Sequence, residues 1–225
     1  MNIDRAKSKF EHYAETHPMG GPVSDFEREF YQKYLQGLKG NIVDIGCGDG
    51  KYISYFHQIT ENAGIYACDI SLKRVQRVKA HGYAGFVGSA ETLPLRNQSV
   101  DWVFLMQVLE HVSNPECVIA ECERVLAPQG CCLILVPNYP AKRIYDWINM
   151  VRHQKWHKWL DDPTHCTKLN HLQLHRLLSN HFSRVDIYPT FIYGEGRLRF
   201  IQEWKTRRRS VMWAAHKLLA VCRRQ

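Results

Sequence analysis

The chain has 225 residues, of which 45% are hydrophobic and 23% are charged, and its formal net charge at pH 7 is +8. This composition is that of a globular protein with one main core, and it excludes a disordered or collagen-like chain. Nine basic residues and one acidic residue lie after residue 196, so this segment carries the whole net charge, the remainder is balanced, and a generally basic nucleic-acid-binding protein is disfavoured.

Three further features bear on where the protein works. No apolar run approaches the roughly 18 residues that a membrane-spanning helix needs. The N-terminal segment MNIDRAKSKFEHYAE carries charges where a signal peptide would be apolar. The eight cysteines include no Cys-x-x-Cys pair, which favours reduced thiols. We therefore expect a cytoplasmic protein.

The first forty residues have a helical pattern. Ser24 is a suitable N-cap for a helix over residues 25–38, and the proline- and glycine-rich run 18–22 separates this helix from the preceding residues. From residue 41 the pattern changes to short, β-rich apolar runs that alternate with amphipathic stretches. The predicted strands are 41–45, 65–68, 85–87, 100–106 and 131–136, and the predicted helices between them are 51–58, 72–80 and 115–126. This alternation predicts a doubly wound, parallel α/β sheet with its ligand at the carboxyl ends of the strands.

A glycine-rich loop, DIGCGDG, follows the first predicted strand. Its glycines allow a sharp turn and the close approach of a ligand to the backbone. The spacing is GxGxG, not the dinucleotide pattern GxGxxG, and Asp44 and Asp49 would repel a pyrophosphate. Asp69, at the end of the second strand, is placed to accept hydrogen bonds from both ribose hydroxyls of an adenosine. The pattern favours an adenosine ligand with an ammonium or sulfonium group; the alternative is a structural turn followed by a surface acid.

Four motifs together resemble a known family: DIGCGDG, ACDIS, GSAETLPLRNQSVDWVFLMQVLEHV and ERVLAPQGCCLILVPN. Over residues 40–190 the chain resembles the class I S-adenosylmethionine-dependent methyltransferases, in particular the small-molecule group that includes the ubiquinone-biosynthesis methyltransferases. The resemblance implies S-adenosyl-L-methionine as the cofactor. It also implies a Rossmann-like, seven-stranded sheet with an antiparallel last hairpin.

The resemblance further implies where the cofactor binds. The methionine moiety would lie by Asp44 and the loop glycines, the ribose on Asp69, the adenine by Ser89–Ala90 and the sulfonium by Met106–Gln107. The full set of expected cofactor-binding residues is Asp44, Gly46, Cys47, Gly48, Gly50, Asp69, Ile70, Ser89, Ala90, Met106 and Gln107. Ser89 departs from the family pattern, which usually has an aspartate there; a serine hydroxyl accepts a hydrogen bond without charge assistance. This departure keeps open a non-catalytic scaffold that binds the cofactor and regulates a partner.

Two histidines are candidates for a catalytic base. Methyl transfer depends mainly on positioning, worth up to ~7–11 kcal/mol, so a base is optional, but a hydroxyl acceptor gains from one with a pKa near neutral. His111 follows the fourth predicted strand in the sequence LEHV. His165 lies in DDPTH and resembles the D-P-x-H loop of many small-molecule methyltransferases. The alternative for both is a side-chain hydrogen bond that fixes a loop.

An aromatic segment, residues 138–167, follows the fifth predicted strand and precedes a predicted helix over 169–178. Insertions at this edge of such a sheet commonly form an acceptor pocket or a lid. The expected acceptor contacts are Asn138, Tyr139, Trp147, Asp162 and His165. The alternative is a helix over 141–160 that packs its tryptophans into the core.

Two pairs of histidines could instead form a metal site. His153 with His157, and His171 with His175, have a spacing that could hold zinc on a helix, and Glu110 and His111 could add ligands. His171 and His175 fall at the border of an apolar face, where half-solvated positions explain them more simply. We therefore expect no metal.

The C-terminal segment is predicted as a basic amphipathic helix over residues 206–224, after a last hairpin formed by 182–188 and 196–204. This helix has four alternative roles: binding to an anionic membrane surface, packing on its own domain, a dimer contact, or RNA binding. The expected domains are a helical cap over 1–40, a methyltransferase domain over 41–204 with the lid at 138–167, and the basic tail over 205–225.

The sequence thus predicts methyl transfer to an oxygen, less readily to a nitrogen or carbon, of a small molecule such as a saccharide or a lipid-linked intermediate. An RNA methyltransferase is the alternative within the same class, disfavoured because the body of the chain is neutral. The expected partners are the small acceptor and, through the C-terminal helix, an anionic membrane surface, which would make the protein peripheral at the membrane. The oligomeric state stays open.

Overall fold

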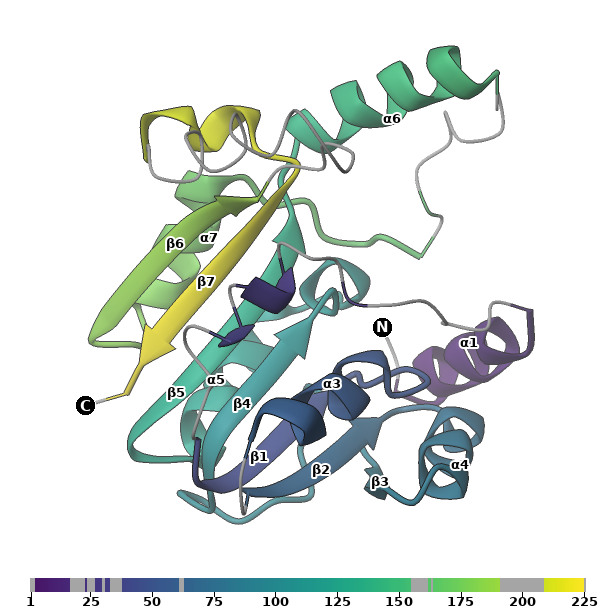
Figure 1. The fold of residues 1–225 in the computed structure, drawn as a ribbon, viewed down its shortest axis with the longest axis vertical. Coiled ribbons are helices and arrows are strands. Elements are labelled where there is room, and N and C mark those ends of the chain that lie inside the picture. The colour runs from purple at the N-terminus through teal and green to yellow at the C-terminus, as the bar shows by residue number, and fades with distance from the viewer. Residues whose placement is uncertain are drawn as a thin grey trace.

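The computed structural model describes residues 3–16, 23, 27–29, 31–32, 38–60, 63–154, 162, 164–190 and 209–224. These residues form a seven-stranded sheet in the order β3-β2-β1-β4-β5-β7-β6 (Figure 1). The first five strands in this order are parallel, whereas β7 runs antiparallel to both β5 and β6. The predicted doubly wound sheet with an antiparallel last hairpin is confirmed.

The strands are β1 (Gly40–Ile45), β2 (Ala63–Asp69), β3 (Ala84–Val87), β4 (Val100–Met106), β5 (Leu126–Pro137), β6 (Arg184–Thr190) and β7 (Lys217–Arg223). The helices are α1 (Ile3–Thr16), α3 (Lys51–Ile59), α4 (Leu72–Ala80), α5 (Pro115–Val125), α6 (Ala141–His153) and α7 (His171–Ser179), with 3-10 helices at Leu109–His111 and Arg209–Ala214. Every strand and helix predicted between residues 41 and 136 is present. Strand β5 begins at Leu126, earlier than predicted, because the chain passes directly from α5 into the sheet.

Two hydrophobic clusters hold the helices on the sheet. Helices α5 and α7 belong to one cluster, through residues such as Ile119 and Leu174. Helix α3 belongs to the other, where the rings of Phe56 and Phe104 stack at 4.1 Å. Successive residues of β5 enter different clusters, so this strand is buried on both faces. Burial on both faces explains the nearly continuous apolar runs from which the strands were predicted.

The C-terminal segment contradicts the prediction of a basic amphipathic helix. Residues 217–223 form β7, which lies inside the sheet between β5 and β6. Its central residues, Leu218–Cys222, are buried because they belong alternately to the two hydrophobic clusters on either face of the sheet. The domain therefore extends through β7, and the predicted boundary between residues 204 and 205 is wrong. The membrane role expected for this helix therefore loses its structural basis. The predicted strand 196–204 lies outside the described residues.

The N-terminal region agrees with the prediction where it is described, whereas the lid region matches the alternative of a helix over 141–160 only in part, because Trp147 is 51% exposed and is not packed into the core. Residues 27–29 and 31–32 are helical, within the predicted helix 25–38, whereas 18–22 lie outside the described part. Helix α6 occupies the first part of the predicted helix 141–160 and ends at His153. None of the described helices is long and apolar enough to span a bilayer.

Candidate active site

A cavity of about 370 Å³ lies at the carboxyl ends of the parallel strands. Eight of the predicted cofactor residues line it: Gly46, Gly48, Asp69, Ile70, Ser89, Ala90, Met106 and Gln107. They come from the ends of β1, β2 and β4 and from the loop after β3. Asp44, Cys47 and Gly50 do not line the cavity but lie at the end of β1 and in the loop that follows it.

The glycine-rich loop depends on backbone angles that only glycine adopts easily. Gly46, Gly48 and Gly50 all have positive φ, and a Cβ on Gly46 would lie 2.4 Å from the Val108 side chain. The loop is tied to β2, because the Gly48 N–H donates to Asp69 Oδ2 at 3.0 Å and the Gly46 N–H donates to the Cys68 carbonyl at 2.7 Å. The turn therefore fixes the Asp69 carboxylate at the cavity wall.

Asp44 places a buried carboxyl group beside this loop. It is 1% exposed, and neither of its carboxylate oxygens has a hydrogen-bond partner among the described residues. Burial and the nearby Asp69 raise the pKa of Asp44, and burial also raises the pKa of Asp69. Asp69 accepts hydrogen bonds from the N–H groups of Gly48 and Ser71, whereas Asp44 has no such partner, so positive charge on a ligand nearby would stabilise its carboxylate. The site therefore fits the sulfonium and the ribose of S-adenosylmethionine.

The predicted adenine end is formed by the loop after β3. The Ser89 hydroxyl oxygen accepts a hydrogen bond from the Glu91 N–H at 3.2 Å, and a bridge pairs Ser89 with Thr92. Ser89 therefore fixes the turn as well as lining the cavity. Glu91, which was not predicted, also lines the cavity and provides a carboxylate near the position where the family usually has an aspartate.

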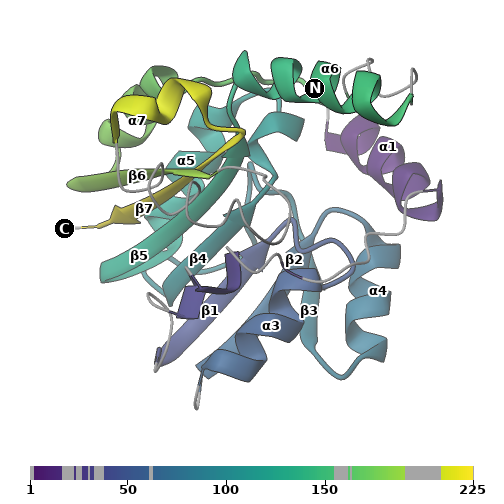
Figure 2. The same ribbon diagram turned by 45° about the horizontal axis from the view of Figure 1, so that its top comes forward.

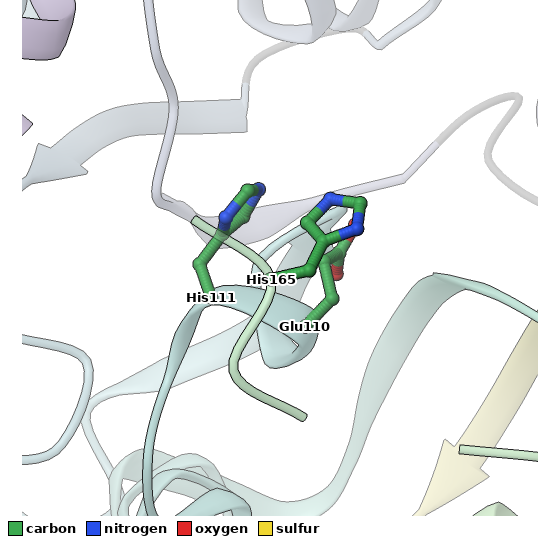
Figure 3. Close-up of side chains that lie close together, drawn as sticks. All are labelled: Glu110, His111 and His165. Carbon is green, nitrogen blue, oxygen red and sulfur yellow. The ribbon is translucent and has the colours of Figure 1, made fainter. Parts of the chain in front are cut away.

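The other end of the cavity contains a cluster of Glu110, His111 and His165 (Figure 3). One potential ligand atom of each residue lies within 4.8 Å of the others, and the two imidazole rings are 4.9 Å apart. Glu110 is 3% exposed, its Oε2 has no hydrogen-bond partner among the described residues, and burial raises its pKa to about 8. Such a set could hold a divalent cation.

The two segments of this cluster are held together by backbone hydrogen bonds. The N–H groups of Cys166 and Thr167 donate to the Glu110 carbonyl at 2.7 and 3.0 Å. From the sequence, Glu110 and His111 were expected as additional ligands of a zinc site formed by other histidines. His171 and His175 instead lie on α7 outside the cluster, and the side chains of His153 and His157 are outside the described residues.

Thr164 determines which nitrogen of His111 carries the proton. Its hydroxyl lies 2.5 Å from Asp162 Oδ1 and 2.8 Å from His111 Nδ1. Although burial acts in the opposite direction, hydrogen bonds from Thr164 and Tyr13 lower the pKa of Asp162, so this carboxylate can only accept. Thr164 then donates to Asp162 and accepts from Nδ1–H of His111. The lone pair of the ring is left on Nε2.

His111 is neutral at physiological pH. Burial, reinforced by the nearby His165, lowers its pKa to about 4. Its ring lines the cavity close to Met106 and Gln107 in the chain. A neutral imidazole with its proton fixed on Nδ1 can accept a proton at Nε2 or bind a metal there, although a pKa of about 4 makes it a weaker base than the near-neutral histidine that the sequence predicted.

The expected acceptor contacts divide into two groups. Asp162 and His165 line the cavity, and the Tyr139 hydroxyl lies behind His165, 2.8 Å from its Nδ1. Asn138 has a structural role, because its amide donates to the carbonyls of Met212 and Ala215 at 2.9 and 2.8 Å. Trp147 is 51% exposed on α6 and does not line the cavity. The predicted acceptor roles of Asn138 and Trp147 are therefore not supported.

Several residues of the cavity wall were missed by the sequence analysis. Phe10 and Tyr13 of α1 line it, and the Tyr13 hydroxyl donates to Asp162 Oδ2 at 3.1 Å. Lys217 lines it from the start of β7, and burial lowers the pKa of this lysine. Recognition of β7 as a strand would have placed Lys217 at this edge of the sheet. No motif marks the residues of α1.

Comparisons with known proteins agree with the observed fold, and the matched region includes the glycine-rich loop after β1. A family model described as a methyltransferase domain matches residues 43–134. The malonyl-[acyl-carrier protein] O-methyltransferase of Methylococcus capsulatus is 29% identical over 48% of this chain and 43% of its own length. The ubiquinone biosynthesis O-methyltransferase of Cupriavidus pinatubonensis is 33% identical over 43% of this chain and 41% of its own. The chain thus spans less than half the length of these two relatives.

A relative named as a probable tRNA methyltransferase also matches this chain, and so do two solved structures. A probable tRNA methyltransferase 9B of Bos taurus is 31% identical over 48% of this chain and 23% of its own length. A possible histamine N-methyltransferase of Thermotoga maritima has a TM-score of 0.62 at 15% identity, over 88% of this chain and 87% of its own. A methyltransferase of Archaeoglobus fulgidus has a TM-score of 0.62 at 16% identity, over 89% and 94%. At these identities the structural matches show the fold alone.

Proposed function

We propose that the S-adenosylmethionine-dependent methyltransferase domain of this chain transfers the methyl group to a hydroxyl oxygen of a small molecule. The observation that supports an oxygen acceptor is His111, whose proton is held on Nδ1 by Thr164 and whose Nε2 is left to accept another. The curated relatives named as O-methyltransferases support the same class of acceptor atom.

Cofactor binding and proton transfer are assigned to residues at opposite ends of the cavity. The glycine-rich loop and Asp69 hold the cofactor, which supplies a methyl group on a positively charged sulfur when it is bound. At the other end, Nε2 of His111 would accept the hydroxyl proton as the acceptor oxygen bonds to the methyl carbon and the bond between that carbon and the cofactor sulfur breaks, which leaves S-adenosylhomocysteine. Asp162, through the Thr164 hydroxyl, stabilises the imidazolium that results. Residues of α1, together with Asp162 and His165, form the wall of this end of the cavity.

The walls of the acceptor end favour a compact molecule with both polar and apolar groups. Phe10, Tyr13 and Tyr52 line the cavity, so aromatic rings and phenolic hydroxyls surround the site. Rings of this kind suit saccharides and the head groups of lipid-linked intermediates. The proposal therefore includes both as acceptor classes.

A tRNA acceptor is the second candidate, because relatives that act on tRNA match the chain as closely as the small-molecule enzymes do. The two candidates differ in what the purified protein retains. Bound nucleic acid that dissociates steeply with added salt would favour the tRNA acceptor. Protein free of nucleic acid, with turnover of a small hydroxyl compound, would favour the first proposal.

Calorimetry with S-adenosylmethionine and S-adenosylhomocysteine tests the cofactor site. Replacement of Asp69 by Ala is expected to weaken binding by about 1–3 kcal/mol, because the ribose hydroxyls lose an acceptor. Asp186→Ala, on β6 and away from the cavity, is the matched control. An affinity for both compounds that is unchanged in Asp69→Ala would remove the ribose assignment.

A screen of hydroxyl-bearing metabolites tests the chemistry. His111→Gln should retain cofactor binding and lose most of the turnover. Binding of the cofactor without turnover of any acceptor class would instead favour the non-catalytic scaffold. A parallel screen with a chelator, followed by added zinc, shows whether Glu110, His111 and His165 act through a cation.

A further inference from the structure

Helix α6 presents an apolar stripe to solvent. Ile144, Trp147, Ile148 and Val151 are 46–55% exposed, and their spacing places them on one face of the helix. Nine large hydrophobic side chains are exposed among the described residues, and four of them belong to this stripe. The exposed apolar surface is therefore concentrated on one element.

The opposite side of α6 is fixed to the protein. The Tyr145 hydroxyl donates to the Ala214 carbonyl at 3.1 Å, and Ala141 and Met150 are 4% and 6% exposed. Lys142 and Asp146 form an ion pair of 2.6 Å along the helix. The helix thus has a buried face that docks on the domain and an apolar face that none of the described elements covers.

The charge on α6 indicates what covers the stripe. The helix carries Lys142, Arg143 and Arg152 against one acid, Asp146. An exposed apolar stripe that includes a tryptophan, on a helix with excess lysine and arginine, is typical of helices that lie in the interface of an anionic membrane.

The position of α6 relates the stripe to the active site. The helix begins two residues after Tyr139, whose hydroxyl contacts His165 at the cavity wall. It projects beyond the edge of the sheet at which β5 ends, the same end as the cavity (Figures 1 and 2). A surface that contacts α6 therefore lies beside the acceptor end of the cavity.

We propose that α6 docks the protein on an anionic lipid surface through Ile144, Trp147, Ile148 and Val151. The docking stands on the geometry and charge of α6 alone. Its consequence, that the acceptor is carried by a lipid, rests on the proposed function. The membrane association expected of the C-terminal segment is thereby assigned to a different element.

Flotation of the full chain with phosphatidylcholine vesicles, with and without phosphatidylglycerol, tests the docking. The unmodified chain should float only with the anionic vesicles. The double variant Trp147→Glu/Ile148→Glu should partition at least about tenfold less, because it places two charges in the apolar layer. The matched control is Leu172→Glu on α7, a single exposed apolar residue that is 68% accessible and should float like the unmodified chain.

Three outcomes would overturn the proposal: no flotation of the unmodified chain, equal flotation of the double variant, or a dimer that the double variant dissociates while vesicles bind neither form. The last would make a second copy the occupant of the stripe. Thermal melting and calorimetry with S-adenosylmethionine show that the variants are folded with an intact cofactor site. Because turnover of a soluble acceptor does not require docking, failure here and failure of the proposed function give different results.

Discussion

Among single residues, Thr164 has the most specific role, because its hydroxyl group donates a hydrogen bond to Asp162 and accepts one from His111. Thr164→Val removes the hydrogen bonds to His111 Nδ1 and Asp162 Oδ1 and leaves the ring free to change its tautomer. We expect turnover to fall about 10- to 100-fold with cofactor affinity unchanged. Steady-state kinetics with calorimetry measure both quantities. Thr164→Ser should restore turnover, and a serine variant as slow as the valine variant would contradict the role of the hydroxyl.

The residues of the site differ in how well the sequence predicts them. Gly46, Asp69 and Ser89 lie in contiguous motifs whose spacing follows from the strand-loop-helix geometry of the cofactor site, so they could be placed in advance. Phe10 and Lys217 line the cavity, and Thr164 contacts His111 of its wall, through tertiary packing of distant segments. No local spacing encodes such an approach, so these residues had to be located in the structure.

At the level of secondary-structure elements, His181 connects the end of α7 to α5. Its two ring nitrogens lie 2.7 Å from Glu123 and 2.9 Å from Glu116. Although burial acts against it, the hydrogen bonds to these carboxylates raise the pKa of His181 above its usual value. The protonated ring therefore binds more strongly in the folded state than in the unfolded state.

This arrangement predicts a pH-dependent contribution to stability. A raised folded-state pKa gives stabilisation that is fully present below the unfolded pKa of about 6.5 and is lost as the pH rises through the folded value. Because both glutamates are partly exposed, we expect about 1 kcal/mol or less. The loss of unfolding free energy caused by His181→Gln should be larger just below pH ~6.5, where the ring is protonated, than above the raised folded-state pKa, where the ring is neutral. His175→Gln, exposed on α7, is the control, and a loss independent of pH would contradict the ion pairs.

Helix α1 covers the cavity. Phe10 packs edge-on against His111 at 5.9 Å, and Tyr13 bonds to Asp162. An ion pair between Lys73 and Glu15 joins the helix to α4. The double variant Phe10→Ala/Tyr13→Phe should speed dissociation of S-adenosylhomocysteine several-fold by loosening this cover, as stopped-flow measurements would show. His12→Ala, on the exposed side of α1, is the control, and an unchanged dissociation rate would show that α1 does not retain the ligand.

Strand β7 shows why one element was wrongly predicted. The sequence from Val211 to Cys222 places its apolar residues at helical spacing, yet it also contains the continuous apolar run Leu218–Cys222. Periodicity alone does not separate a short buried strand from a helix. The open hydrogen-bonding edges of β5 and β6 decide the outcome, since both pair with this segment. The parallel strands were easier to predict because glycine turns and intervening helices delimit them.

For the whole molecule, the part of the C-terminal positive charge that the structure describes belongs to the domain. Lys217 lines the cavity, Arg223 lies at the far end of β7, and the Arg224 guanidinium donates to the Leu126 carbonyl. At least these three residues belong to the fold and do not form a separate basic surface. The net charge of +8 is therefore weak evidence for an appended binding segment.

The position of β7 makes the last residues of the chain essential for folding. Seven residue pairs join β7 to β5 and seven join it to β6, so its removal leaves two strand edges without partners and exposes the apolar faces of both. A chain that ends at His216 should give no cooperative thermal transition, whereas an appended helix could be removed without this effect.

Leu219→Asp, at a position that is 1% exposed, should destabilise the full chain by about 3 kcal/mol or more, because it buries a charge. Trp213→Asp, at a position that is 67% exposed, should change the free energy of unfolding by less than about 0.5 kcal/mol. Equal effects of these two substitutions in denaturant unfolding would contradict the burial of β7 between β5 and β6.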